Sequence, residues 1–212
     1  MFLGFALMAG LPTLFIISIV RGIRRKSTPW TITAVATGLL GFGMVGLLNY
    51  YGAKTTTETI SRPEAAFTID VPMHWRELYF GLGSEPADLE VGSHASQEYL
   101  MVISEPRADY DGEMDAAGYA QLVSEAILEF FKDGRRSELT PIAVNGMSGW
   151  KCEIQGSRNG VRLHYLVTLL EGEDHFFQLV FWTSPSKVAV ALPVFEEVAT
   201  TLRQTTVEKP GP

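Results

Sequence analysis

The stretch His175-Phe-Phe-Gln-Leu-Val-Phe-Trp-Thr183 predicts a β-strand that is apolar on both faces. Successive side chains of a strand point to opposite faces of its sheet. A sheet with such a strand at its centre needs apolar cover on both sides, and helices are the usual cover. We therefore expect a sheet sandwiched by helices.

The sequence upstream of this strand indicates an antiparallel sheet. Asn145-Gly146 and Asn159-Gly160 each predict a two-residue hairpin turn, because both central positions of that turn need positive φ. Alternating or continuous apolar residues between these turns indicate strands of ordinary length. The predicted strands before 175–183 are 66–72, 86–94, 98–105, 139–144, 147–157 and 161–170.

Two helices complete the predicted fold. The first runs over 115–131, with Asp115 as N-cap and Gly134 after its end. Its apolar stripe is predicted to consist of Leu122, Ala126 and Phe130 with Tyr119, Val123 and Ile127. The second begins near Pro193, since proline suits a first helical turn. Strands, helix, four antiparallel strands and helix together predict an α+β fold with an antiparallel sheet between helices.

The two ends of this region carry a family resemblance. An opening strand that runs into Pro-x-x-Trp, Phe67-Thr-Ile-Asp-Val-Pro72-Met-His-Trp75, resembles the PsbP/DcrB-like family. So do the aromatic strand 175–183, Ser184-Pro185 and Pro193-Val-Phe195. Over about residues 62–205 the resemblance implies an antiparallel sheet sandwiched by helices, a role in the assembly or stability of larger complexes, and no shared catalytic residues. DcrB-like members resemble lipoproteins, whereas this chain has no lipobox cysteine.

The N-terminal 53 residues predict a two-helix transmembrane anchor. Residues 2–20 and 30–48 contain no Asp, Glu, Lys or Arg, and each run has about the ~20 residues that cross a bilayer. Arg21, Arg24, Arg25 and Lys26 place the loop 21–29 in the cytoplasm. A cleaved signal peptide is the alternative for the first run, but its basic residues would come before the apolar stretch. We expect a multi-pass protein of the cytoplasmic (inner) membrane, with both termini on the extracytoplasmic side.

Charge and cysteine content limit what the rest of the chain does. We expect a polar tether over 54–63, a soluble domain over 64–207 and a disordered tail over 208–212. Residues 60–212 hold 12 Lys/Arg against 23 Asp/Glu, a net charge of 12 − 23 = −11. Such acidity argues against binding nucleic acid or anionic headgroups. The single cysteine excludes an intramolecular disulfide.

No catalytic motif emerges from the sequence. Gly146-Met-Ser148-Gly149-Trp150 approaches a nucleophile elbow but has Trp in place of the last glycine and follows a hairpin turn. A two-residue turn at 159–160 would pair Cys152 with Val167 and His164 with Gln155. Cys152 and His164 would then lie on opposite faces, which predicts Cys152 as a core residue and excludes a Cys–His pair.

Metal sites are not predicted either. His74, His94, His164 and His175 are scattered without the short spacings of zinc ligands, and we expect them at the surface. The acidic loop 109–115 superficially resembles a calcium loop, but Ala120 stands where the bidentate Glu would be. We expect a solvated turn and a helix N-cap there; weak divalent binding is the alternative.

The leading hypothesis is therefore a membrane-anchored, extracytoplasmic, non-enzymatic interaction or complex-assembly module with a protein partner in or at the membrane. We expect no catalytic residues, no cofactor and no metal. The alternative is a small-ligand-binding or sensing domain, with a pocket lined by aromatics such as Trp75, Tyr79 and Phe80. An enzyme with an unrecognised site ranks third. The domain released from its anchor is expected to be a soluble monomer.

Overall fold

The computed structural model describes residues 56–79, 87–110 and 114–205. The chain divides into two units, residues 1–55 and 56–212, and every described residue belongs to the second. The predicted membrane spans 2–20 and 30–48, the loop 21–29 and the tail 208–212 lie outside the described residues. In the part that is described, no helix combines the length and apolar character needed to span a bilayer.

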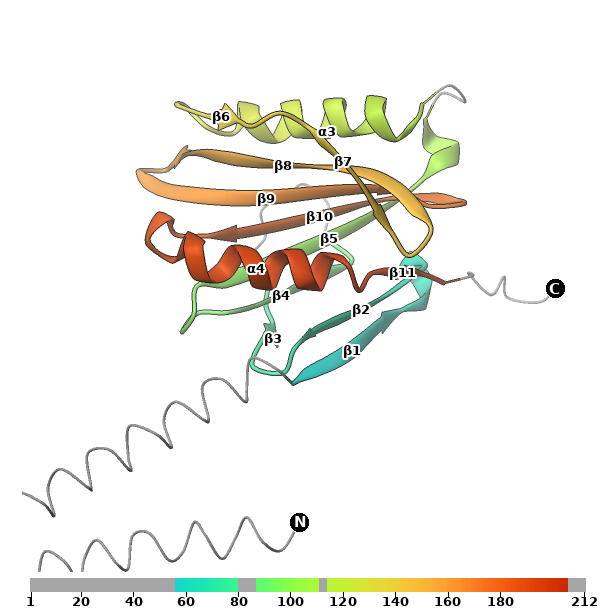
Figure 1. Cartoon of the computed structure of the whole chain (residues 1–212), viewed down its shortest axis with the longest axis horizontal. Helices are drawn as coiled ribbons and strands as arrows, with labels where there is room; N and C mark the ends of the chain where they lie inside the picture. The colour runs from blue at the N-terminus through green and yellow to red at the C-terminus, as the bar shows by residue number, and fades with distance from the viewer. Residues whose placement is uncertain (1–55, 80–86, 111–113, 206–212) are drawn as a thin grey trace, which may run out of the picture. The chain divides into compact units, whose positions relative to one another are not determined.

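The main sheet is antiparallel throughout and has eight strands (Figure 1). Its order is β3-β4-β5-β10-β9-β8-β6, and β7 pairs with β8 beside β6. The strands are β3 (Arg76–Glu77), β4 (Leu89–Ser93), β5 (Glu98–Pro106), β6 (Arg135–Arg136), β7 (Thr140–Val144), β8 (Met147–Arg158), β9 (Val161–Glu171) and β10 (His175–Thr183).

Strand β10 lies inside the sheet and is buried on both faces, as predicted. It pairs with β5 on one side and β9 on the other. Phe177, Leu179 and Phe181 face one apolar core, while Phe176, Val180 and Trp182 face a second core on the opposite side. The alternation of β10 side chains thus divides the interior of the domain into two cores.

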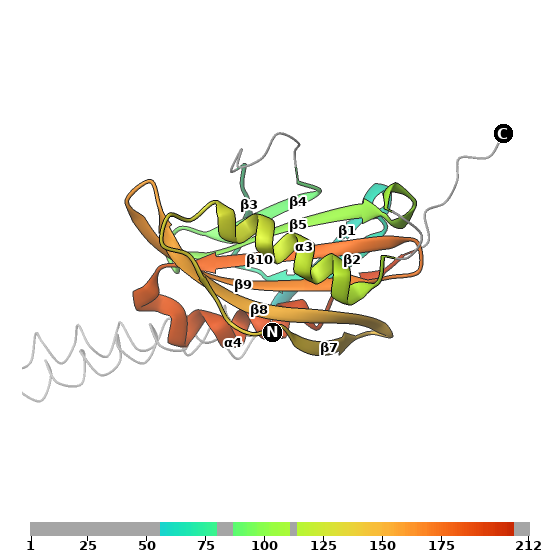
Figure 2. The same cartoon turned by 90° about the horizontal axis from the view of Figure 1, so that it is seen from above.

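Each core is closed by one helix, which confirms the sandwich (Figures 1 and 2). Helix α3 (Ala116–Glu129) covers β8 and β9, and its N-cap is Asp115, whose Oδ1 accepts a 2.8 Å hydrogen bond from Gly118 N. Helix α4 (Val188–Ala199) packs Ala191, Phe195 and Val198 onto the other face.

Helix α4 begins five residues earlier than the predicted start near Pro193. The short 3₁₀ helix η3 (Pro185–Lys187) leads into it, and Pro193 lies inside the helix. Pro193 is exposed, and so is Ala189, whose carbonyl loses its helical donor. Ala191 and Phe195, four residues apart, both pack on the core, and this packing keeps the helix continuous through Pro193.

A second, three-stranded sheet packs beside α4, with the order β1-β2-β11. Its strands are β1 (Thr57–Arg62), β2 (Phe67–Pro72) and β11 (Arg203–Gln204), and η1 (Pro63–Ala65) joins the first two. The predicted polar tether over 54–63 is therefore wrong for residues 57–62. Most residues of β1 are polar and exposed, and only Ile60 packs against the core. The sequence therefore lacks the alternation of apolar and polar residues that would predict a strand.

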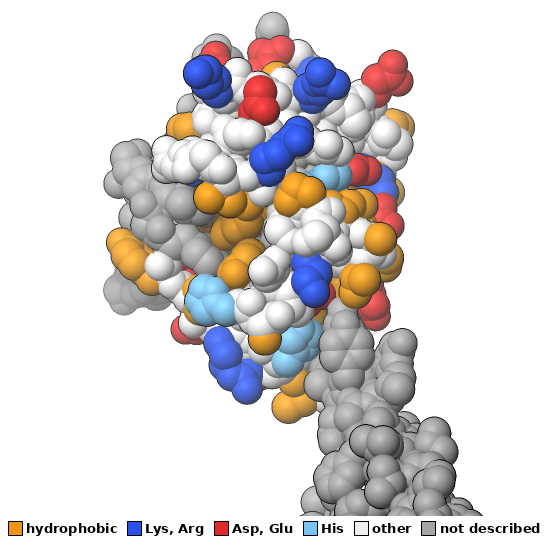
Figure 3. Space-filling view, turned by 90° about the vertical axis from the view of Figure 1, so that its left-hand side faces the viewer, with side chains coloured by type: hydrophobic (Ala, Val, Ile, Leu, Met, Phe, Trp, Pro, Cys, Tyr) orange, Lys and Arg blue, Asp and Glu red, His pale blue; other side chains and the backbone are white. Residues whose placement is uncertain are grey.

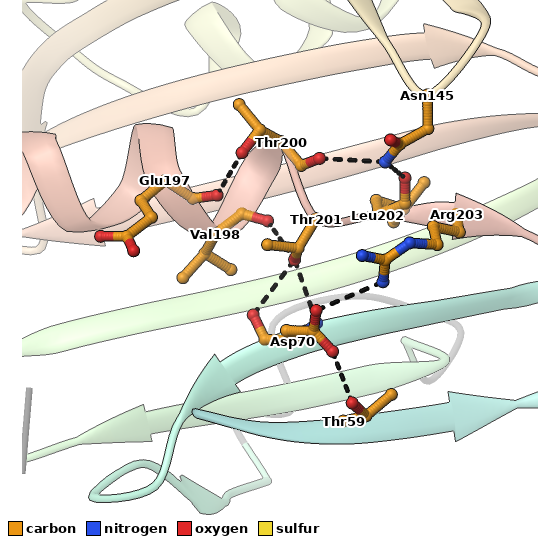
Figure 4. A network of polar contacts seen from close by, with 9 residues as sticks. All are labelled: Thr59, Asp70, Asn145, Glu197, Val198, Thr200, Thr201, Leu202 and Arg203. Carbon is orange, nitrogen blue, oxygen red and sulfur yellow. Dashed lines mark hydrogen bonds and ion pairs between the residues drawn. The ribbon is translucent and has the colours of Figure 1, made fainter. Parts of the chain in front are cut away.

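Polar contacts hold the residues that follow α4 against β2 on one side and the β7–β8 turn on the other (Figure 4). Thr201 Oγ1 accepts a hydrogen bond from Asp70 N at 3.0 Å. The Asp70 carboxylate accepts a hydrogen bond from Thr59 Oγ1 at 2.5 Å and forms an ion pair with Arg203 at 3.2 Å. Asn145 Nδ2 donates to Thr200 O at 3.0 Å and Leu202 O at 2.7 Å. The β7–β8 turn, α4 and β2 are thereby held together.

Both predicted hairpin turns are confirmed. Asn145 and Asn159 have φ of 48° and 52°, and the glycine after each also has positive φ. Arg158 pairs with Val161 across the second turn, which sets Cys152 opposite Val167 and His164 opposite Gln155. The register of β8 and β9 therefore follows from a two-residue turn.

Candidate functional site

The outward side of α3 exposes apolar side chains that the sequence assigned to its buried stripe. Tyr119 and Val123 are buried, but Leu122 is half exposed and Phe130, just after the helix, is 60% exposed. Ala126 is exposed as well, so the prediction is wrong for Leu122, Ala126 and Phe130. The apolar side chains of α3 cover a wider part of the helix surface than the part that contacts the sheet, and those outside the contact face solvent.

Phe130 is part of a cluster with the β8–β9 turn. The guanidinium of Arg158 lies 5.4 Å from the centre of the Phe130 ring, in a cation–π arrangement. Val161, the cross-strand partner of Arg158, is 58% exposed. Arginine and aromatic side chains dominate the energetics of protein interfaces, so we take this cluster as a candidate protein-binding surface.

The same end of the molecule concentrates positive charge in an acidic domain. Asp133 is held to the β8–β9 hairpin, because its carboxylate accepts from Ser157 N at 2.6 Å and from Ser157 Oγ at 3.1 Å. These bonds lower the pKa of Asp133. Glu125, which Gln121 links to Arg136, and Glu129 are the other carboxylates here. The cations are Lys132, Arg135, Arg136, Arg158 and Arg162.

We call this surface the basic end and define it as Phe130, Val161 and those five cations. Figure 3 views the domain from this side. Lys and Arg side chains gather in the upper part of the face, together with acidic ones, and hydrophobic side chains lie below them around a hollowed region. The face therefore combines apolar side chains with charged side chains of both signs.

A row of aromatic rings supports the basic end from below. Phe131 meets Tyr165 edge to face at 5.2 Å, and Tyr165 stacks on Trp182 at 6.0 Å, which in turn stacks on Tyr99 at 5.4 Å. A Cβ at Gly156 would lie 2.6 Å from Phe131 Cβ, so only glycine lets the helix end approach β8 this closely. Phe130 is thus presented from a well-packed base.

The opposite end of β9 and α3 is hollow and acidic. An open hollow of about 460 Å³ is lined by Pro106, Arg107, Ala108, Met114, Glu173, Asp174 and His175. Arg107 is already engaged, because it pairs with Glu171 at 2.7 Å and points a second nitrogen at the Gly172 and Glu173 carbonyls. Glu173 and Asp174 are exposed. We call this surface the acidic end and define it as the residues of the hollow with Glu171.

A compact polar cluster lies beneath the acidic end. One oxygen of Glu105 accepts from Tyr110 at 2.6 Å, from Tyr119 at 2.5 Å and from Gln178 at 2.9 Å. Burial raises the pKa of both tyrosines, and their bonds to Glu105 add to the effect. The phenols therefore stay protonated as donors, and they join η2 (Arg107–Asp109) and α3 to the sheet.

The sequence was right about Cys152 and about its separation from His164. Cys152 is buried in the core under α3, and burial raises the pKa of its thiol to about 11. His164 points to the other face, where its Nε2 lies 2.8 Å from Glu153 Oε2. Ser148 is an exposed residue of β8 directly after the turn. These residues form no nucleophile–base pair.

The expectation that all four histidines lie at the surface is only partly met. His94 is exposed, His74 and His175 are half-buried, and His164 is buried by its place on β9. In the described residues, no three His, Cys, Asp or Glu side chains converge as metal ligands would. Of the acidic loop 109–115, residues 111–113 lie outside the described residues, and Asp115 is the N-cap predicted.

The two described residues of the predicted aromatic pocket, Trp75 and Tyr79, do not come together. Trp75 is fully buried, stacks edge to face on Phe195 and donates from Nε1 to Glu98 Oε2 at 3.2 Å. Tyr79 is 84% exposed, and Phe80 lies outside the described residues. Trp75 is a core residue and does not share a cavity with Tyr79.

Comparison with known proteins places the fold. No protein-family model matches this chain, and no curated protein matches it in sequence. Its structure is similar to that of cyanobacterial PsbP (CyanoP) from Synechocystis sp. PCC 6803, with a TM-score of 0.52 and 16% identity over 70% of this chain and 92% of that one. It is also similar to LpqN, involved in cell envelope biogenesis of Mycobacterium tuberculosis, with a TM-score of 0.51 and 14% identity over 71% and 91%.

A third similar structure comes from Bacteroides thetaiotaomicron VPI-5482, with a TM-score of 0.50 and 13% identity over 73% of this chain and 51% of that one. At these identities the similarity concerns the arrangement of the chain and not its activity. The domain has a PsbP-like fold: an antiparallel sheet packed between helices.

Proposed function

We propose that this protein is a membrane-anchored, extracytoplasmic, non-enzymatic module that binds a protein partner through its basic end. The observation that carries the proposal is the exposed cluster of Phe130, Arg158 and Val161 on a packed base. Such a cluster buries apolar area on binding and offers a guanidinium for carboxylates of the partner.

The surroundings of this cluster favour an acidic protein partner. Five cations lie at the basic end, although residues 60–212 carry an excess of acidic residues. Complementary charge speeds association and selects among partners. The PsbP-like resemblance, including its DcrB branch, adds the expectation of a role in complex assembly.

The extracytoplasmic address rests on the sequence of residues 1–53, whose two uncharged runs flank a basic loop. A reporter that is active only outside the cytoplasm should work when fused after Lys54 and fail when fused within 22–26. The opposite pattern of activity would place the domain in the cytoplasm and remove this part of the proposal.

Partner binding is tested by the size of the complex formed by the full chain in gently solubilised membranes. Phe130→Asp should shift the protein to a smaller species on a native gel, because it removes the aromatic group and adds a charge that repels an acidic partner. Val190→Asp is the matched control, since Val190 is 51% exposed on α4, and it should leave the size unchanged. Equal effects of the two substitutions, with the fold intact by circular dichroism, would contradict the proposal.

A further inference from the structure

The basic and acidic ends lie at opposite ends of the same two elements. Ala116 N, at the start of α3, donates to Glu171 Oε2 at 2.9 Å, and Phe130, at its other end, contacts Arg158. β9 likewise runs from Val161 to Glu171. A helix of 14 residues is about 21 Å long and a strand of 11 residues about 36 Å. The two ends of one molecule are therefore too far apart to contact each other.

The two ends are complementary in charge. Glu173 and Asp174 are exposed at the acidic end, whereas Arg107 is occupied by Glu171 and two carbonyls. The basic end has three carboxylates among its five cations, and one of the three, Asp133, is hydrogen-bonded to Ser157. Free carboxylates thus predominate at one end and guanidinium groups at the other.

The two ends are also complementary in shape and polarity. Phe130 stands out from the basic end with Arg158 beside its ring. The hollow at the acidic end has apolar walls from Pro106, Ala108 and Met114. Its volume of about 460 Å³ is in the range that accommodates a bound side chain or small ligand.

We infer that the basic end of one copy of this chain binds the acidic end of a second copy, so that copies associate head to tail. The inference rests on the proposed function and names the partner of that surface. Phe130 enters the hollow, and Arg158 pairs with the carboxylates at its rim, where a guanidinium binds in two-pronged geometry. Because the contact joins two different surfaces, it leaves one free end on each copy and continues into chains.

Two charge-reversal variants of the full chain test this arrangement. Arg158→Glu disables the basic end, and the double change Glu173→Lys with Asp174→Lys disables the acidic end. Each variant is produced with two different tags, and co-capture between tags is measured in solubilised membranes at low salt. Either variant alone should lose at least tenfold of the wild-type co-capture.

The decisive sample mixes the two variants. The intact acidic end of the Arg158→Glu copy still meets the intact basic end of the other copy, so co-capture should recover, but only as dimers and not as longer chains. Lys187→Glu and Glu197→Lys, both exposed and on the α4 side, are matched controls that should leave co-capture unchanged. Raising the salt to 1 M should weaken co-capture of the wild type.

Three results would overturn the inference. Co-capture that is unaffected by either variant shows that the copies meet through another surface, and no co-capture of the wild type shows that they do not meet. Loss in the Arg158→Glu variant alone shows a symmetric contact between two basic ends. If Phe130→Asp still reduces the size of the native complex while no two copies co-capture, the basic end binds a different protein, and the proposed function stands without this inference.

Discussion

At the scale of single residues, Cys152 shows how burial controls chemistry. The thiol lies in the core under α3, and burial raises its pKa to about 11. The thiolate is the form that reacts, so a thiol reagent at pH 8 should modify the folded chain at least ~100-fold more slowly than the denatured chain, as each unit of pKa reduces the thiolate tenfold and packing limits access further. Rapid modification of the folded chain, followed by mass spectrometry, would contradict this placement.

The same residue gives a pH-dependent stability with a definite sign. The folded-state pKa is above the ordinary value of 9.0, so the native thiol keeps its proton where the unfolded one loses it. Stability from this residue is complete below pH 9 and falls as the pH rises toward 11. The urea stability of the wild type should drop by about 1–3 kcal/mol more than that of Cys152→Ala over this range. Parallel pH profiles would show that the thiol is not buried.

The two hairpin asparagines form a natural matched pair. Both have positive φ, but only Asn145 donates hydrogen bonds across to the end of α4. Asn145→Ala should cost about 1–3 kcal/mol more than Asn159→Ala, because it removes two hydrogen bonds in addition to a residue suited to the turn. Equal midpoints of urea unfolding would mean that these bonds contribute nothing.

At the scale of elements, β1 decides where the folded unit begins. Ile60 packs on the core, and β1 pairs with all six residues of β2. A fragment that starts at Thr56 should fold cooperatively, whereas one that starts at Pro63 leaves β2 as an edge strand with Phe67, Ile69 and Val71 behind it. We expect the shorter fragment to lose several kcal/mol of stability or to aggregate. Identical urea midpoints for the two fragments would show that β1 contributes no stability and acts only as a tether.

The sequence predicts the strongly apolar and turn-bounded elements well. Two Asn-Gly turns determine the β8–β9 register and the neighbours of β7, and the range 175–183 for β10 is confirmed. The two-residue strands β3, β6 and β11 carry no periodic signal, and β1 is mostly polar. These elements form because their neighbours offer a free edge, which local sequence does not reveal.

The basic end was missed for a related reason. The sequence shows that Leu122 and Phe130 belong to the apolar side of α3, but their exposure depends on how far the sheet extends beneath the helix. The clustering of Arg158 and Arg162 with Lys132 and Arg135 also needs the hairpin to be placed beside the helix end. The concentration of charge over residues 132–162 was the one signal available in the sequence.

At the scale of the whole molecule, the interior of the domain is structural and its two ends differ in charge. The Glu105 cluster and the Asp70 network use buried or half-buried polar groups to join layers. The exposed chemistry lies at the ends of α3 and β9. Binding through the basic end leaves the acidic end free for a second contact.

Site-specific photo-crosslinking of the full chain in intact membranes tests directly whether the basic end contacts a protein partner. A photoreactive residue at position 130 should give a discrete adduct with a protein, and Arg158→Glu in the same chain should abolish it. The same residue at position 190, which is similarly exposed on α4, should give none. Adducts of equal yield at both positions, or no adduct at position 130, would contradict the assignment of the basic end as the partner-binding surface.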